Sequence, residues 1–441
     1  MASMTLPTGT HFYASCALLT ALAAAPAMAD EVTKWNEASG KAALDSGLAG
    51  NPLFHARVDA MTHAAVHDAL NAIQRRYRPY SFDVPATPGA SPEAAVAAAA
   101  HDVLVDQYNQ LSGFGIVSQK AVLDGVYAAT LAAIPNGSAK SAGIAIGQAA
   151  ALNILSLRAT DGWNTQTVLD FNYPQGTAPG EYRFTPPNNF VFLPQWGDMR
   201  PFVLKDSEQF WPGRPYPLDG KRYGDDYNEV KRLGGDGVQT LSARTRDQTE
   251  IALFWLESSP IQWNRIARTV SATRTLTLWE NARLFALLNF ALMDGYIGTF
   301  QAKYHFNFWR PITAIRLGET DGNPDTAGDP SWTPLVETPP IPDHDSGHAV
   351  EGGAGAQVLE RFFGTNTQRF QVCSTSLPAG SRCTDPAPVR RSFTSFSHAA
   401  EENALSRILV GFHFRRAVKE GTEHGRKIGN RAYNRYLRPA Q

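Results

Sequence analysis

Hydrophobic residues recur every three or four positions along most of the chain between residues 32 and 157. Phe54, Val58, Met61, Ala65 and Ala69 show this spacing, which places their side chains on one face of an α-helix. No segment shows a convincing strand-like alternation, so we predict an all-α fold. Similar spacing and helix-start signals predict further helices over residues 92–105, 138–157, 245–263, 278–303, 346–363 and 397–437, and from about residue 223, with a break at Gly411.

The composition changes between residues 161 and 222, where proline, glycine, asparagine and aromatic residues replace the helical pattern. Irregular segments of this length in compact proteins usually cover a functional site. This one is also a candidate for a homodimer interface. We therefore expect two packed helical bundles: an N-terminal helical domain over residues 30–160 and, after the irregular segment, a C-terminal bundle over residues 223–441.

The first 29 residues have the features of a secretory signal peptide. An apolar stretch from Ala14 ends with Ala27-Met28-Ala29 before Asp30, the small-x-small pattern of a cleavage site. We expect export to the periplasm or the extracellular space. The stretch before it has no lysine or arginine, so a cytosolic chain is the alternative. Beyond residue 29 no run of about 18 apolar residues remains, and we expect no membrane span.

The net charge and the positions of the cysteines limit the possible class of protein and its compartment. The chain has 40 Lys and Arg against 41 Asp and Glu, a formal net charge of −1, which argues against a nucleic-acid-binding protein because such proteins usually carry a basic excess. Cys373 and Cys383 lie ten residues apart in a loop. In an oxidising compartment they are expected to form a disulfide; two unrelated thiols are the alternative.

Lys303 and Arg310 are the first candidates for chemistry. They are seven residues apart, so on one helix their side chains would lie on the same face, two turns apart. Pro311 disfavours helical geometry at Arg310, which puts the pair at a helix end, where two cations can converge on an anion. The alternative is an ordinary helix end that places its charges in water.

Two further clusters could bind the same kind of ligand. Ser346-Gly347-His348 begins a predicted helix, and helix N-termini bind phosphate-like anions through free N–H groups. Arg407 and His413 flank Gly411 and would face different ways on one continuous helix. A turn at Gly411 is therefore needed to bring them together.

In order and spacing, the three clusters resemble the signature of the vanadium haloperoxidase and type 2 phosphatidic acid phosphatase superfamily. The matching motifs are Lys303-x6-Arg310-Pro311, Ser346-Gly347-His348 and Ser406-Arg407-x5-His413. The aromatic stretch that ends Phe308-Trp309-Arg310-Pro311 is more similar to the haloperoxidase branch, in particular to secreted bacterial haloperoxidase-like proteins.

The resemblance implies an oxyanion site that binds vanadate or a phosphoryl group. It implies that Lys303, Arg310 and Arg407 neutralise the oxyanion and that Ser346 and the Gly347 N–H donate hydrogen bonds to it. In a haloperoxidase, His413 would coordinate the vanadium of vanadate, His348 would serve as acid and base, and Lys303 would polarise bound peroxide. In a phosphatase, His413 would be the nucleophile that forms a phospho-histidine, and no cofactor would be needed.

The sequence departs from the family pattern in two places. The family's aspartate four residues after the last histidine is Ala417 here, which removes the usual carboxylate beside that histidine. Asp343 and Asp345 stand just before Ser346, where Tyr-Pro is common. These carboxylates could weaken oxyanion binding, pair with an arginine, or raise the pKa of His348. Ile341 and Trp309 are our candidates for residues that tune selectivity around the site.

Three functions follow as hypotheses. The first is a vanadium-dependent haloperoxidase that uses hydrogen peroxide and halide to make a hypohalous-acid-type species, which halogenates an organic acceptor. The second is an acid phosphatase of the same superfamily that acts on soluble phosphomonoesters. The third is a non-catalytic oxyanion-binding protein of helical fold.

Overall fold

A computed structural model describes Met1 and residues 30–440. The predicted signal peptide, apart from Met1, lies outside the described residues. The helices and strands are α1 Glu31–Ser46, α2 Pro52–Ile73, α3 Pro92–Leu111, α4 Lys120–Ala133, α5 Ser138–Arg158, β1 Leu169–Asp170, β2 Val191–Phe192, α6 Lys221–Gly234, α7 Arg246–Phe254, α8 Ser259–Ser271, α9 Leu278–Phe306, α10 Pro311–Arg316, α11 Gly347–Phe363, β3 Thr367–Cys373, β4 Arg390–Ser395, α12 Phe396–Leu409 and α13 Arg415–Arg435.

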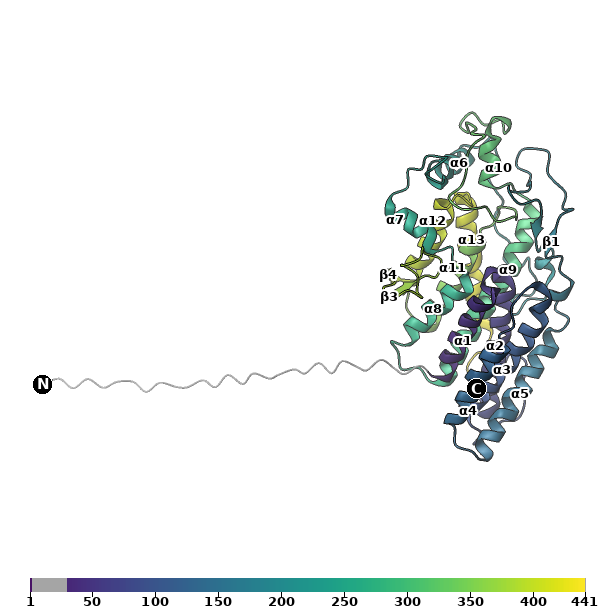
Figure 1. The fold of residues 1–441 in the computed structure, drawn as a ribbon, viewed down its shortest axis with the longest axis vertical. Helices are drawn as coiled ribbons and strands as arrows, with labels where there is room; N and C mark the ends of the chain where they lie inside the picture. Colours follow the sequence, from purple (N-terminus) through teal and green to yellow (C-terminus); the bar gives the residue numbers. More distant parts are fainter. Residues whose placement is uncertain (2–29, 441) are drawn as a thin grey trace.

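Helix α9 is the central element of the fold. Thr277 and Glu280 form a capping box that begins it, which satisfies free N–H groups of its first turn. Its side chains are buried nearly all round between Trp279 and Lys303, the pattern of a helix enclosed by protein. It packs against α2, α11 and α13 (Figure 1). Lys303 therefore lies inside the protein although its side chain is charged.

Helices α1 to α5 gather at one end of the molecule, and α6 and α10 lie near the other (Figure 1). Buried side chains of α2, α9, α11 and α13 join one hydrophobic core. A smaller core contains residues of α6 and α10 together with Trp309, Trp332 and Phe414. The predicted all-α fold is confirmed, while the domain boundaries stay a prediction.

Strands are more extensive than expected. β3 and β4 pair antiparallel, with Phe370 opposite Phe393, and the two rings lie 5.3 Å apart against the core. A disulfide joins Cys373 to Cys383 in the connection between them. The expectation of no β-structure was wrong here because hydrophobic side chains do not alternate along the whole of either strand: β3 buries Phe370, Val372 and Cys373 at one end, and β4 buries Phe393.

The single helix predicted over residues 245–263 was also wrong. The chain forms α7, ends it at Phe254, and begins α8 at Ser259. Pro260 stands in the first turn of α8, where a missing N–H costs nothing. The predicted capping box of Thr245 and Gln248 is present at the start of α7.

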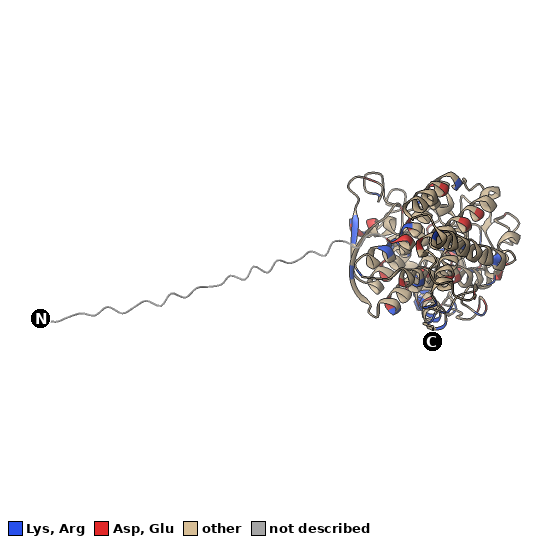
Figure 2. Ribbon diagram, turned by 90° about the horizontal axis from the view of Figure 1, so that it is seen from below, with Lys and Arg blue, Asp and Glu red and all other residues tan. Residues whose placement is uncertain are grey.

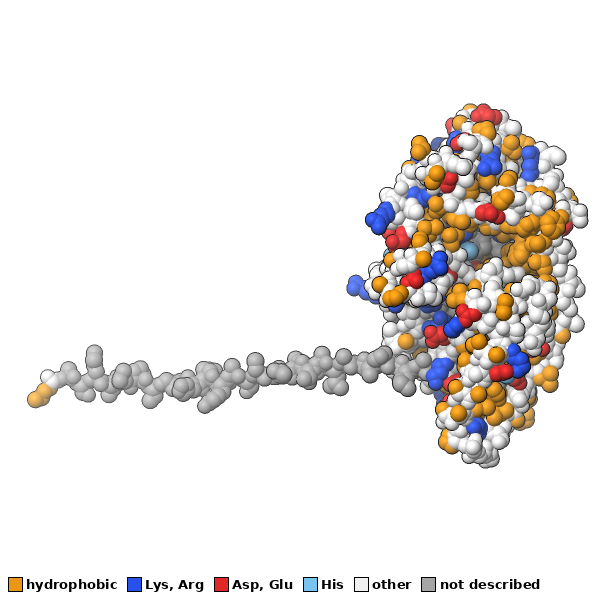
Figure 3. Space-filling model, viewed as in Figure 1, with side chains coloured by type: hydrophobic (Ala, Val, Ile, Leu, Met, Phe, Trp, Pro, Cys, Tyr) orange, Lys and Arg blue, Asp and Glu red, His pale blue; other side chains and the backbone are white. Residues whose placement is uncertain are grey.

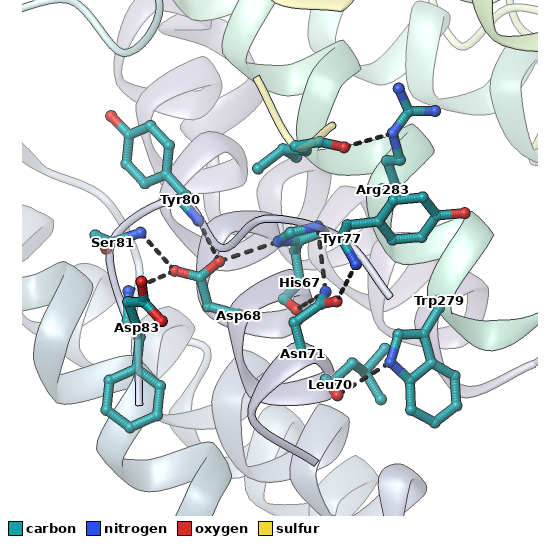
Figure 4. Close-up of polar contacts among 12 residues, drawn as sticks. His67, Asp68, Leu70, Asn71, Tyr77, Tyr80, Ser81, Asp83, Trp279 and Arg283 are labelled. Carbon is teal, nitrogen blue, oxygen red and sulfur yellow. Dashed lines mark hydrogen bonds and ion pairs between the residues drawn. The ribbon is translucent and has the colours of Figure 1, made fainter. Parts of the chain in front are cut away.

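Buried polar side chains hold irregular backbone against the helices. On α9, the carboxylate of Asp294 accepts N–H bonds from residues 202–204, at 2.6 to 2.7 Å, which ties the irregular segment to this helix. On α2, Asp68 does the same for Tyr80 and Ser81, and Asn71 accepts the N–H of Tyr77 (Figure 4). These bonds satisfy backbone groups that no regular element pairs.

The described surface fits the charge balance of the sequence. Basic and acidic residues are interspersed along the chain (Figure 2). Within residues 30–440, no helix combines the length and the hydropathy that crossing a membrane requires.

Contact between α11 and α13 depends on glycine. A Cβ atom added at Gly425 would lie 1.9 Å from the carbonyl oxygen of Val350, so Gly425→Ala should lower the free energy of unfolding by about 1–3 kcal/mol through overpacking. Gly125→Ala in α4 is the matched control, since a Cβ there meets no atom within 4 Å, and alanine should stabilise that helix by up to about 1 kcal/mol. Chemical denaturation of both variants measures the difference, and equal stability would contradict the close packing.

Candidate active site

Lys303 and Arg310 converge from two elements rather than along one helix. Helix α9 ends at Phe306 because Asn307 adopts a left-handed conformation with φ of 46°. Arg310 then stands at the N-cap of α10, whose first residue is Pro311. The one-helix geometry suggested by the seven-residue spacing was therefore wrong. A turn brings the two cations together.

Ser346, Gly347 and His348 lie where the sequence places them. Ser346 is the N-cap of α11, and Gly347 is its first residue. The Ser346 hydroxyl is buried and makes no hydrogen bond with the described residues. It is therefore free to donate to a ligand at this helix N-terminus.

The turn required at Gly411 is present. Helix α12 ends at Leu409, and Gly411 has φ of 88°, a conformation that favours glycine. The chain folds back so tightly that the N–H groups of Phe412 and His413 both reach the carbonyl oxygen of Arg407, at 3.0 and 3.2 Å. His413 thus faces the same space as Arg407.

The structure brings the predicted site residues together. Six of them line one cavity of about 440 Å³: Lys303, Arg310, Gly347, His348, Arg407 and His413. Ser346 adjoins it in the chain. Figure 3 shows a hollow with histidine surface inside it, next to hydrophobic surface. Ile341 also lines the cavity, whereas Trp309 is fully buried in the smaller core.

Three buried cations dominate the charge of this site. Lys303, Arg310 and Arg407 are at most 3% exposed, and none of them forms an ion pair within residues 30–440. Backbone carbonyls hold them instead: Lys303 Nζ donates to Pro342 and Asp343, both at 3.0 Å. Burial and the charge of Arg310 lower the pKa of Lys303 well below its usual value.

The remaining polar atoms fit an oxyanion. Arg407 donates one N–H to the Trp255 carbonyl at 3.0 Å, while its Nε and the Ser346 hydroxyl are buried without a partner among the described residues. Buried polar groups in native proteins are almost always satisfied. A tetrahedral oxyanion supplies both the negative charge and the acceptor oxygens that this donor set lacks.

Asp343 supplies a carboxylate that the sequence seemed to lack. His413 Nδ1 lies 2.8 Å from Asp343 Oδ1, and Arg310 Nη1 lies 3.0 Å from His413 Nε2. Since arginine only donates, the ring proton lies on Nδ1 and the Nε2 lone pair faces the cations. Ala417, at the family's aspartate position, is fully buried. The pairing was missed because Asp343 is 70 residues away from His413 in the chain.

Asp345 has a different role, because it contacts residues of α9 and α13 next to the start of α11. Its carboxylate accepts from His424 Nδ1 at 2.9 Å and from the Thr299 hydroxyl at 2.5 Å. Burial opposes ionisation, but His424 and Thr299 outweigh it and lower the pKa of Asp345 to about 2. Asp345 thereby links Ser346 to α9 and α13.

The alternatives for the two aspartates can now be compared with the structure. Within residues 30–440, neither Asp343 nor Asp345 forms an ion pair with an arginine. The alternative of a raised pKa at His348 is not supported, because burial and Arg407 lower the pKa of this histidine well below its usual value. His348 is therefore a neutral imidazole that can accept a proton.

In this arrangement, motifs from three segments of a helical-bundle protein line one cavity. Residues 283–441 match the family model described as the VCPO second helical-bundle domain. The curated vanadium chloroperoxidase of Curvularia inaequalis is 28% identical, over 50% of this chain and 45% of that protein. The aligned part thus spans less than half the length of that relative.

Solved structures share the fold over a larger part of the chain. A bacterial vanadium-dependent iodoperoxidase superposes with a TM-score of 0.75 at 23% identity, covering 93% of this chain and 98% of that one. A bacterial vanadium-dependent chloroperoxidase gives 0.68 at 17% identity, covering 86% and 91%. The comparisons confirm the resemblance to vanadium haloperoxidases that the three motifs indicate.

The contact between Asp343 and His413 leads to a prediction. Asp343→Asn should weaken binding of inorganic vanadate by about 10- to 100-fold, because a partner that orients a ligating histidine has effects of this size. Burial raises the pKa of Asp343 to about 7, so the wild-type carboxylate is mostly ionised at pH 8 and mostly protonated at pH 6. The difference between variant and wild type should accordingly be larger at pH 8.

Isothermal titration calorimetry at both pH values measures this effect. Asp225→Asn is the control, since that exposed carboxylate pairs with Lys221 on α6. Equal vanadate affinity of Asp343→Asn and wild type at pH 8 would show that Asp343 does not support His413.

Proposed function

We propose that this protein is a vanadium-dependent haloperoxidase, which oxidises halide with hydrogen peroxide and halogenates an organic acceptor. The observation that carries the proposal is the cluster of three buried cations without an acidic partner in the described chain, beside the unpartnered Ser346 hydroxyl. The confirmed resemblance to vanadium haloperoxidases supports it.

The chain's own residues divide the work. Lys303, Arg310 and Arg407 neutralise the bound oxyanion, and Ser346 and the Gly347 N–H donate to it. Such donors stabilise charge without rearranging during the reaction. The lone pair of His413 Nε2 is the one available to coordinate vanadium. Vanadate, when bound, supplies the Lewis acidity that activates peroxide toward halide.

His348 and Lys303 handle protons and charge around the reacting oxygens. The unpartnered Nε2 of His348 faces the cavity, and its lowered pKa leaves it neutral, so it can take a proton from hydrogen peroxide as this binds. Returning that proton to the departing oxygen completes its role. Lys303 is positioned to stabilise negative charge on the same oxygens.

A phosphatase of the same superfamily is the second candidate, favoured by the contact between Asp343 and His413. A carboxylate that holds the Nδ1 proton leaves Nε2 available as a nucleophile. His413 would attack phosphorus, and the ester P–O bond would break. His348, after taking a proton from solvent, would protonate the alkoxide, and water would then hydrolyse the phospho-histidine. This reaction needs no cofactor.

Export to an oxidising compartment is part of the proposal. Helix α1 begins at Glu31, and the Asp30 side chain caps it, so cleavage after Ala29 would leave the first helix intact. The disulfide between Cys373 and Cys383 supports the same compartment.

The mature protein with excess vanadate should brominate an organic acceptor only when hydrogen peroxide and bromide are both present. His413→Ala should lower this turnover by at least about 1,000-fold, since it removes the ring nitrogen that we assign to coordinate vanadium. Halogenation is followed spectrophotometrically. A wild type that binds vanadate without halogenating, yet hydrolyses a phosphomonoester, would establish the phosphatase. A wild type that binds vanadate with neither activity would leave the non-catalytic function.

Arg407→Ala should weaken vanadate binding by about 10- to 100-fold, because hydrogen bonds to charged groups contribute about 1.5–3 kcal/mol. Arg369→Ala, at an exposed position on β3, is the matched control and should bind like wild type. Equilibrium dialysis measures both affinities. If Arg407→Ala bound vanadate as tightly as wild type, the oxyanion site would be misplaced.

A further inference from the structure

The cavity that contains Lys303, Arg310 and Arg407 is otherwise lined mostly by apolar side chains. Its rim and sides come from the start of α2, from the irregular segment, from α9 and from the loop before α11. Apolar side chains that line it include Leu53, Leu169, Phe190, Phe192, Pro340 and Ile341. The volume of about 440 Å³ falls within the range of pockets that enclose small organic molecules.

The two ends of this cavity differ in charge and in exposure to solvent. Leu169 on its rim is 42% exposed, and the neighbouring Phe171, whose ring lies 5.4 Å from that of Phe190, is 55% exposed. The three cations are almost completely buried. No Asp or Glu is among the lining residues, all of which lie in the described part of the chain. A molecule that enters passes apolar walls before it reaches the cationic floor.

Phe190 and Phe192 form an aromatic wall of the cavity, and hydrogen bonds fix the position of this wall relative to the oxyanion site. The N–H of Phe192 donates to the Pro340 carbonyl at 3.1 Å, and its carbonyl accepts the Tyr304 hydroxyl at 2.6 Å. Tyr304 directly follows Lys303 on α9, and Pro340 directly precedes the lining residue Ile341. The wall therefore keeps its position relative to Lys303 and Arg310 without a conformational change, which lowers the entropic cost of binding.

We propose that this cavity is the acceptor-binding site and that it takes an electron-rich aromatic compound of the phenol class, halogenated while it is bound. The inference rests on the proposed haloperoxidase. Phenyl walls contact the faces and edges of the ring, and the cationic floor attracts the oxygen of the phenol. Asn188, which also lines the cavity, is a polar side chain within this wall.

The halogenation step balances with the reagents already proposed. Hydrogen peroxide oxidises halide to hypohalous acid, with one proton taken up and water released. A ring carbon of the phenol then forms a bond to the halogen as the halogen–oxygen bond breaks. The proton lost from that carbon joins the hydroxide, and the second product is water. Holding the ring beside the site lets this occur before hypohalous acid diffuses away.

Binding and turnover of 2-naphthol test the proposal separately. Phe192→Ala should weaken 2-naphthol binding to the protein without vanadate by about tenfold, since it removes an aromatic contact with the ring and the apolar area that this contact buries. Phe192→Leu should recover part of the affinity, and Leu152→Ala, which removes an exposed side chain on α5, should leave it unchanged. Equilibrium dialysis gives the dissociation constants.

Turnover then shows whether halogenation happens inside the cavity. Phe192→Ala should lower kcat/KM for bromination of 2-naphthol about tenfold, while Leu152→Ala, the exposed control, should brominate 2-naphthol as wild type does. With 2-naphthol and a hydrophilic phenol in competition, wild type should favour 2-naphthol more than reagent hypobromous acid does.

Each outcome decides one part of the proposal. Undetectable 2-naphthol binding, or a product ratio equal to that of reagent hypobromous acid, would overturn the acceptor site. Binding that Phe192→Ala weakens, in a wild type that oxidises no halide, would overturn the proposed haloperoxidase and the halogenation step while supporting the aromatic site.

Discussion

The burial of three cations in one place is the constraint on which the rest of this structure depends. Lys303, Arg310 and Arg407 lie within the protein without a carboxylate paired to any of them in the described chain. Burying unpaired charge is costly, so the fold must hold these groups by other means. Backbone carbonyls of Pro342, Asp343, Ile341, Phe412 and Trp255 accept their N–H groups. These carbonyls do not neutralise the positive charge, and the Nε of Arg407 has no partner among the described residues. The remaining charge and donor would favour an oxyanion as ligand.

The two aspartates just before Ser346 have different partners and different roles. Asp343 lies next to His413 and determines which ring nitrogen keeps its lone pair. Asp345, two residues further on, points to His424 and Thr299 and stabilises the start of α11 from behind. Neither neutralises a cation by direct pairing. The positive field therefore remains available to a ligand, although two carboxylates stand next to the motif in the sequence.

Irregular backbone contributes as much to the site as the helices do. The segment between α5 and α6 is fastened by Asp294, which caps residues 202–204, and by the contacts of Phe192 with Pro340 and Tyr304. These bonds hold its aromatic side chains beside a cationic pocket. Such a long loop would otherwise have a large conformational entropy to lose on binding a ligand.

The sequence by itself determined the helical class, the capping box of α7, the start of α11 at Ser346 and the need for a turn at Gly411. Each of these depends on contacts between residues a few positions apart, which local sequence records. It also indicated, as a set, residues that the structure brings together around one cavity, because three short motifs occur in a fixed order. Three features were decided only by the tertiary structure. Lys303 and Arg310 are brought to one cavity by a turn at Asn307, which has a left-handed conformation. Asp343 contacts His413, and phenylalanines from the irregular segment line the cavity. The first of these depends on a turn between two helices, and the contacts of Asp343 with His413 and of Phe192 with Tyr304 join residues 70 and 112 positions apart. Their geometry depends on how α9, α11 and the connecting loops pack.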